Sequence, residues 1–269
     1  MSIFLFSPLF AAYLLALAFL VGACMGSFVN CVQMRLSERS GSIFGRSRCP
    51  KCGHTLGILD LFPVLSYAFL RGKCRYCKAP VDFNYLAVEL IFGAGYVGIF
   101  AMFGLSWLTL EYLLLFTLLA ASSLSDLRTL EVPDSLHIAS IVVFAAFIMT
   151  HADPLHRLID GLIGFAVYGA GMLVLSLVAD KVYKKDTLGG ADIKMLAVLG
   201  LFFGPVKMLL LLILSCLLGL AGAALAKAGL GKEFPFIPAI TLGAYITALF
   251  ADPIIEWYLG LFSLALHSH

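Results

Sequence analysis

Two stretches decide how this chain is organised: Ser122-Ser123-Leu124-Ser125-Asp126-Leu127-Arg128 and Gly189-Gly190-Ala191-Asp192-Ile193-Lys194. Each places a carboxylate at one end of a long apolar run. A charged side chain at the centre of a membrane helix costs about 2.5–3.5 kcal/mol on insertion scales. Such a cost usually marks function, so the two carboxylates are the first candidates for a site.

The composition predicts an integral membrane protein. Of 269 residues, 61% are hydrophobic and only 13% are charged, with a mean hydropathy of +1.00. These values lie far outside the range of soluble domains. The first basic residue, Arg35, follows the opening apolar run, whereas a cleavable signal carries its positive region first. We therefore expect the opening run to be a retained span.

Apolar runs of about 20 residues predict transmembrane helices, and eight are present. They cover residues 8–33, 84–104, 107–125, 136–150, 158–180, 192–204, 206–227 and 239–262. The expected fold is an all-α polytopic bundle. The fourth and sixth runs are short, so we expect them to border an aqueous cavity that satisfies their backbone ends. Glycines such as Gly22, Gly26, Gly200 and Gly204 indicate close helix packing.

The basic residues indicate the orientation, because Lys and Arg concentrate on the cytoplasmic side of a membrane protein. With residues 34–83 inside, 16 of the 18 lie on that side and only Arg157 and Lys207 lie on the other. This asymmetry predicts an even number of spans and puts Asp126 and Asp192 on the cytoplasmic face. The expected parts are a first span (1–33), a cytoplasmic domain (34–83) and a membrane-embedded bundle (84–269).

Four cysteines form two pairs in the polar insertion: Cys49 with Cys52, and Cys74 with Cys77. Two Cys-x-x-Cys pairs separated by a loop are typical of a closed structural zinc site. A metal would also explain how a domain of about 50 residues is stable. Free thiols or a regulatory disulfide are the alternatives. We read His54 as a loop residue, and the remaining cysteines as small core hydrophobes; these are Cys24, Cys31 and Cys216.

The two aspartates can be interpreted as structural residues at helix ends or as a functional pair. Asp192 suits a helix N-terminus, but Asp126 follows its apolar run, where the helix dipole disfavours a negative charge. If the two carboxyls lie close together they share one proton, as an acid/base pair requires. Lys194 would bias which one is charged, or would only anchor the helix at the interface. Asp134 competes for the role, but after Pro133 it suits a helix start.

The chain resembles the type IV prepilin peptidases, a family of bifunctional leader peptidases and N-methyltransferases, along nearly its whole length. The matching segments are Gly26-Ser27-Phe28-Val29-Asn30 with Arg35, the two cysteine pairs, Phe62-Pro63-Val64-Leu65-Ser66-Tyr67, Leu70-Arg71-Gly72-Lys73, Val88-Glu89-Leu90, Asp126 with Pro133-Asp134, and Gly189-Gly190-Ala191-Asp192-Ile193-Lys194. Two positions depart from the family pattern, because Ala191 and Ile237 replace glycines.

The resemblance implies cleavage of the basic leader of prepilins or pseudopilins at the cytoplasmic face of a bacterial inner membrane. A methyl group from S-adenosylmethionine would then be transferred to the new N-terminus. Asp126 and Asp192 carry over as the catalytic pair, and the four paired cysteines as zinc ligands. No residue is assigned to the methyl donor, for which Glu89 and Asn30 are candidates by position.

Two other functions remain open from the sequence. One is an intramembrane aspartyl protease of the preflagellin type without methyltransferase activity, against which the long cysteine-bearing insertion argues. The other is a proton-coupled membrane transporter, which inverted repeats would favour, and none is evident between the halves. We expect protein substrates and membrane lipid as partners and no nucleic acid. The sequence gives no oligomeric state.

Overall fold

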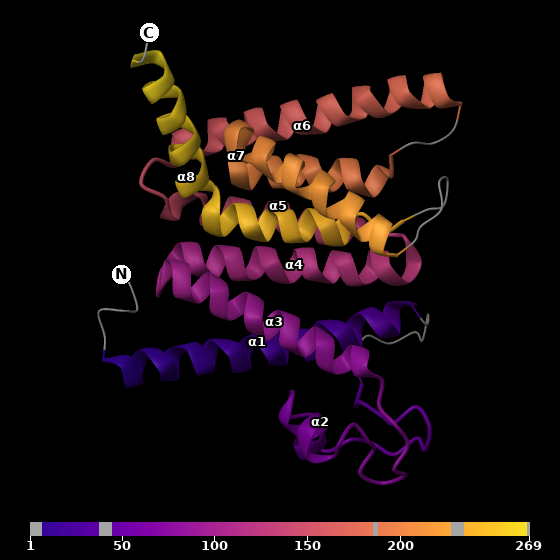
Figure 1. Ribbon diagram of the computed structural model, residues 1–269. Helices are drawn as coiled ribbons and strands as arrows, with labels where there is room; N and C mark the ends of the chain where they lie inside the picture. Colours follow the sequence, from indigo (N-terminus) through magenta and orange to yellow (C-terminus); the bar gives the residue numbers. More distant parts are fainter. Residues whose placement is uncertain (1–6, 38–44, 185–187, 227–233, 268–269) are drawn as a thin grey trace. The chain divides into compact units, whose positions relative to one another are not determined.

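A computed structural model describes residues 7–37, 45–184, 188–226 and 234–267, and throughout these residues the regular structure is helical. The chain divides into two compact units, Met1–Thr129 and Leu130–His269 (Figure 1). Each unit is described by itself below. The expected division at residues 33 and 83 remains a prediction.

Three long helices form the membrane part of the first unit: α1 (Pro8–Ser37), α3 (Phe83–Phe103) and α4 (Trp107–Thr129). Small residues allow α1 and α3 to approach closely. A Cβ on Gly22 would lie 2.6 Å from the carbonyl oxygen of Phe92, so no larger residue fits there. Such contacts are the usual way in which helices associate in a membrane, as the glycine pattern predicted.

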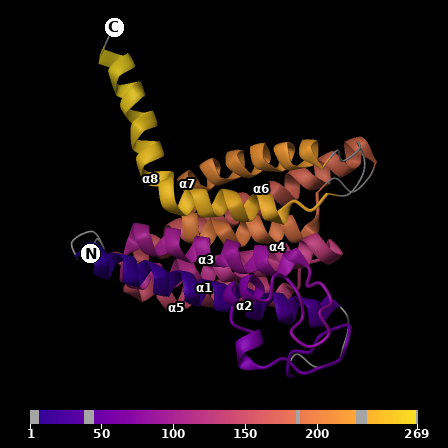
Figure 2. The ribbon, with the colours of Figure 1, turned by 60° about the horizontal axis from the view of Figure 1, so that its bottom comes forward.

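Between α1 and α3 lies an insertion with little regular structure. It contains a 3₁₀ turn, η2 (Ile58–Asp60), a short helix, α2 (Leu65–Phe69), and two isolated β-bridges. Figures 1 and 2 show α2 beside α1 and α3, while the loops of the insertion continue past the start of α3.

The second unit contains α5 (Asp134–Phe147), η3 (Ile148–Thr150), α6 (Pro154–Tyr183), α7 (Gly190–Leu225) and α8 (Ile237–His267). α6 and α7 cross at Gly164 and Gly200, where backbone meets backbone. α8 carries an internal proline, Pro253, and bends along its length (Figure 2). Proline accounts for such a bend, because it removes one backbone hydrogen bond and clashes with the preceding turn.

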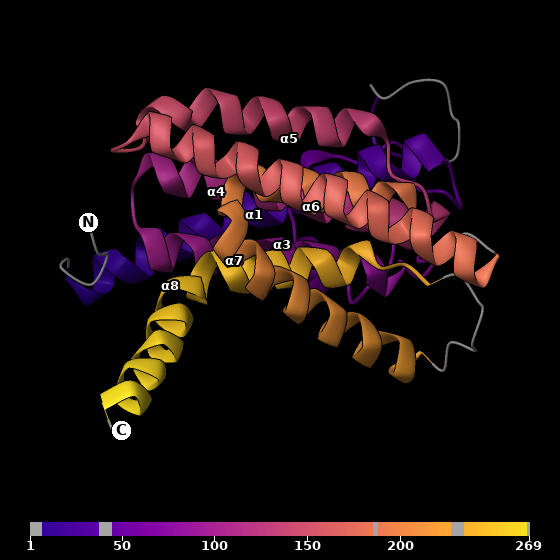
Figure 3. The same cartoon turned by 90° about the horizontal axis from the view of Figure 1, so that it is seen from above.

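α7 is two helical segments joined at Gly204. This residue has φ 64° and ψ −179°, outside the helical region, and Pro205 follows it. Glycine tolerates this backbone conformation, and proline suits the start of the new segment. In Figures 1 and 3 the two segments run from the bend back toward the same side. The expected runs 192–204 and 206–227 are therefore separate helices in the structure.

The prediction of an all-α polytopic membrane protein is confirmed. Within the described residues, six helices are long and apolar enough to cross a membrane, and Asp134–Thr150 is a shorter apolar helix. With the two segments of α7 counted separately, all eight predicted runs are helical. The prediction that the unpaired cysteines lie in the core is wrong for Cys24 and Cys216, whose side chains are exposed on the outside of α1 and α7.

Candidate functional site

The four paired cysteines converge on one point. Their sulfur atoms all lie within 4.8 Å of one another, and the sulfurs of Cys49 and Cys77 are 3.9 Å apart. A tetrahedral zinc with Zn–S bonds of about 2.3 Å requires sulfurs about 3.8 Å apart. The geometry therefore fits a four-sulfur metal site. His54 lies outside the group, with its ring centroid 3.6 Å from that of Tyr76.

The two cysteine pairs sit on turns with the same hydrogen bonds. At the first turn the N–H of Cys49 donates to His54 O at 3.0 Å, and Gly53 N–H donates back to Cys49 O at 2.8 Å. At the second turn Cys74 N–H donates to Ala79 O at 2.8 Å, and Lys78 N–H donates to Cys74 O at 3.0 Å. Each loop thus presents two sulfurs in the same way, as a symmetric site requires.

The backbone of the first turn also prepares its thiol for a metal. The N–H groups of Cys52 and Lys51 stabilise the thiolate and lower the pKa of Cys49 to about 6. A metal binds the thiolate and not the thiol, so this shift favours Cys49 as a ligand. At the second turn the Ala79 N–H would lower the pKa of Cys77, but burial and hydrogen bonds to the other three cysteines outweigh it and raise this pKa to about 11, so a metal has to displace the proton of Cys77.

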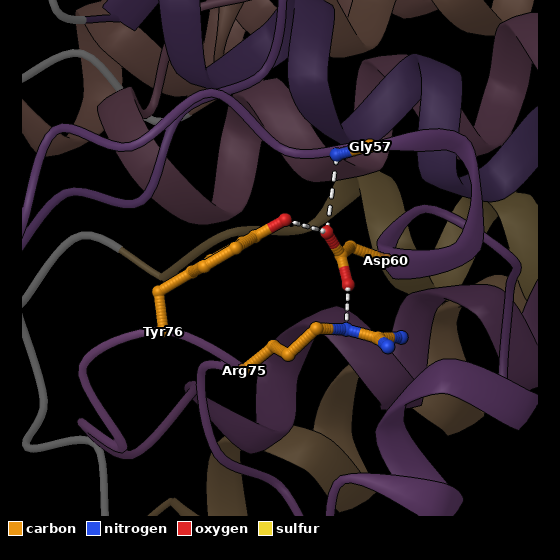
Figure 4. A network of polar contacts seen from close by, with 4 residues as sticks. All are labelled: Gly57, Asp60, Arg75 and Tyr76. Carbon is orange, nitrogen blue, oxygen red and sulfur yellow. Dashed lines mark hydrogen bonds and ion pairs between the residues drawn. The ribbon is translucent and has the colours of Figure 1, made fainter.

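A polar network ties the second turn to the residues between the turns (Figure 4). The carboxylate of Asp60 accepts hydrogen bonds from Arg75 Nε at 2.6 Å, Tyr76 Oη at 3.2 Å and Gly57 N–H at 3.0 Å. Burial alone would raise the pKa of Asp60, but the Gly57 N–H and the Arg75 guanidinium outweigh it and hold this pKa below its usual range. Asp60 is therefore a charged cross-link within the domain.

A second contact fixes the insertion to the helices. The backbone N–H of Val64 donates to a carboxylate oxygen of Glu89 on α3 at 2.7 Å, and Ser27 on α1 also hydrogen-bonds to Glu89. Val64 has φ 61°, which is rare for a β-branched residue and persists only where the surroundings enforce it. Glu89 thus joins α1, α3 and the insertion at one point.

Asp126 lies in the last turns of α4 and is buried. The serines before it are satisfied within the helix, since Ser122 donates to Leu118 O at 2.9 Å and Ser123 donates to Leu119 O at 3.0 Å. Arg128, two residues further on, donates to the side chain of the buried Asn30 on α1 at 2.5 Å. This bond fixes the end of α4 that carries Asp126.

Asp192 is the third residue of α7, in the first turn after the cap residue Gly189. Its side chain is partly exposed, and its N–H donates to Gly189 O at 3.1 Å. Two residues later, Lys194 Nζ lies 2.7 Å from the carboxylate of Asp134. Asp134 is the first residue of α5, as its place after Pro133 predicted. The ion pair links the N-terminal turns of α5 and α7.

The structure brings the four cysteines that were predicted as ligands together. Asp126 belongs to the first compact unit and Asp192 to the second. Sequence reasoning missed two groups that position these sites, the Asp60–Arg75 pair and the Arg128–Asn30 bond. Asp60 had a signal in the sequence, because it is one of only two acidic residues among seven basic ones in residues 45–82.

These features define a class: a multi-pass helical membrane protein with a four-cysteine cluster in an insertion and an acidic residue at the end of each of two apolar helices. Residues 20–103 match the bacterial peptidase A24 N-terminal domain, and residues 113–224 match the type IV leader peptidase family. The chain belongs to the type IV leader peptidase family.

Curated relatives extend over most of the chain. It is 32% identical over 250 residues to the prepilin leader peptidase/N-methyltransferase of Bacillus subtilis (strain 168), covering 91% of this chain and 98% of that protein. The proteins of the same name from Myxococcus xanthus (strain DK1622) and Aeromonas hydrophila are 31% and 34% identical, covering 86% and 80% of this chain and 67% and 74% of theirs. No solved structure matches the chain.

Proposed function

We propose that this protein cleaves the leader from prepilins or pseudopilins and methylates the new N-terminus with S-adenosylmethionine. The observation that carries the proposal is its similarity, over most of its length, to proteins named prepilin leader peptidase/N-methyltransferase. The preflagellin-type and transporter alternatives are not favoured by these relatives. The protein would act in a bacterial inner membrane, with its site facing the cytoplasm.

Asp126 and Asp192 are the proposed catalytic pair. Asp192 lies in the first turn of α7, where the helix dipole favours a carboxylate, whereas Asp126 lies in the last turns of α4, where the dipole disfavours one. We therefore assign the base to Asp192 and the acid to Asp126. Asp192 takes a proton from water, the hydroxide attacks the scissile carbonyl, and protonated Asp126 donates a hydrogen bond to the carbonyl oxygen.

The products follow from a second proton transfer. Collapse of the tetrahedral intermediate breaks the C–N bond, and the leaving nitrogen takes the proton that Asp192 removed from water. The leader departs with a new carboxyl group and the mature chain with a new amine. That amine is the group that the methyl donor would alkylate.

The cysteine cluster is proposed to hold structural zinc. A four-thiolate site is closed to substrate, so the metal would supply folding free energy to the insertion and no catalysis. The sites of S-adenosylmethionine contact are not assigned. Both positional candidates already have structural partners, Glu89 with Val64 N–H and Asn30 with Arg128.

Replacement of each aspartate by asparagine tests the pair. Membranes containing wild type, Asp126→Asn or Asp192→Asn are incubated with a prepilin and methyl-labelled S-adenosylmethionine. We expect each variant to lose cleavage by at least about 10²-fold, the range for a general acid or base. Asp134→Asn is the matched control, because Asp134 is an aspartate at a helix start whose carboxylate pairs with Lys194. Normal cleavage by either catalytic variant would remove that residue from the mechanism.

A further inference from the structure

The insertion carries an apolar edge that none of the residues described by the structure covers. We give this name to Ile58, Leu59, Phe62, Leu65 and Phe69. Their exposed fractions are 86%, 73%, 43%, 46% and 83%. Leu65 and Phe69 are four residues apart on α2 and therefore share one face. So many large apolar side chains within twelve residues indicate a binding surface.

The position of the apolar edge along the membrane span α3 follows from the hydrogen bond that attaches the edge to this helix. Val64 hydrogen-bonds to Glu89, which lies six residues after the first residue of α3. Six residues correspond to about 9 Å along a helix axis, and the whole of α3 is about 30 Å long, the thickness of the hydrocarbon core. The segment around Val64 therefore lies alongside the span, and Figures 1 and 2 show α2 in that place.

The helices expose apolar side chains to their surroundings at the same level. Phe28 on α1 adjoins Ser27 and is 62% exposed, and Ile91 on α3 is two residues from Glu89 and is 60% exposed. At this level a span contacts lipid wherever protein does not cover it. The apolar edge thus continues the lipid-facing surface of the two helices.

The charge of the insertion selects the lipid. Residues 45–82 contain seven basic side chains and only two acidic ones. The basic residues are Arg46, Arg48, Lys51, Arg71, Lys73, Arg75 and Lys78, all of which are exposed. A basic surface next to an inserted apolar segment favours anionic headgroups, and the two attractions together give stable anchoring where either alone is weak.

We propose that residues 58–69 are an interfacial anchor that inserts Ile58, Leu59 and Phe69 into the anionic lipid surface on the side of the membrane that carries the metal-binding domain. The anchor holds this domain against the bilayer, so that the two cysteine turns stay close to the ends of α1 and α3. Its occupant is phospholipid, not a second copy of the chain or another protein.

Tryptophan fluorescence in full-length protein tests the anchor. Both natural tryptophans are replaced (Trp107→Phe and Trp257→Phe), and helicity by circular dichroism checks this background. Phe69→Trp is then added, or Leu59→Trp as an independent second probe. Lys51→Trp is the matched control, since Lys51 is a charged, exposed residue of a cysteine turn. The proteins are placed in nanodiscs of phosphatidylcholine and phosphatidylglycerol, with and without bromine near the headgroup end of the acyl chains.

We expect Phe69→Trp and Leu59→Trp to lose about half of their emission to the brominated lipid, because interfacial segments reach about 5–10 Å below the headgroups. Lys51→Trp should lose little. The loss should shrink in discs without phosphatidylglycerol, and an unchanged loss would overturn the preference for anionic lipid. Quenching of the two probes by aqueous iodide as complete as that of Lys51→Trp would overturn the anchor. Protection from iodide without quenching by brominated lipid would show that protein covers the edge, which also contradicts the proposal.

Discussion

The crossing of α6 and α7 gives the sharpest stability prediction, through Gly164→Ala. A Cβ at this position would overlap the carbonyl oxygen of Gly200 and lie 3.0 Å from its carbonyl carbon and 3.1 Å from Gly204 Cα. These are backbone atoms and cannot rotate away. The two helices must therefore separate by about 1 Å to restore ordinary contact, which forfeits up to about half of the dispersion attraction there.

The same helix offers a matched control. Gly171 also lies within α6, but a Cβ there would meet nothing within 4 Å. Overpacking costs about 1–3 kcal/mol, whereas Gly→Ala in an open helical position gains about 0.5–1 kcal/mol. The propensity gain applies to both positions and cancels, so Gly164→Ala should be less stable than Gly171→Ala by about 1–3 kcal/mol.

Equilibrium unfolding in mixed micelles, with a rising fraction of sodium dodecyl sulfate and followed by circular dichroism, measures this difference. Cleavage of a prepilin provides a second readout, because the first segment of α7 begins with the turn that carries Asp192. Equal unfolding midpoints for the two variants would refute the close backbone contact at Gly164.

Two further predictions concern the insertion. Cys49→Ser should remove one sulfur of the four-sulfur site and abolish the roughly equimolar zinc expected in the purified protein. The control Cys216→Ser, on the outside of α7, should retain the zinc. Absence of metal from the purified wild-type protein would contradict the site. Arg75→Met should lower the free energy of local opening of residues 57–61 by about 1 kcal/mol, measured by hydrogen exchange. This value is that of a hydrogen bond to a charged group, reduced because the Arg75 side chain is half exposed to solvent. Because the pKa of Asp60 is lowered in the folded protein, its contribution is present above the ordinary carboxyl pKa and is lost as pH falls below about 4. Arg75→Met should make this loss smaller than in wild type, because the pKa of Asp60 then lies closer to its value in the unfolded chain, and identical pH profiles would exclude Arg75 as the cause.

Sequence reasoning located the four-cysteine cluster and the apolar helices because each signal is local. Hydropathy over 20 residues depends on neighbours in the chain, and the cysteine spacing within each turn is fixed by two intervening residues. The assignment of Asp134 to a helix start also needed only the proline before it. The errors at Cys24 and Cys216 have one cause, since an apolar run shows that a helix crosses lipid but not which of its faces meets lipid.

The sequence by itself determined that this protein is a membrane bundle of eight apolar helical segments with a four-cysteine insertion, and to which family it belongs. Only the tertiary structure decided that Glu89 receives Val64 N–H, that Asp60 pairs with Arg75 and that α7 turns at Gly204. The first two contacts join residues 25 and 15 positions apart in the chain. No periodicity encodes them, because they depend on the path of the backbone between their partners. The turn at Gly204 needs a positive φ that glycine permits but does not require, so packing decides it.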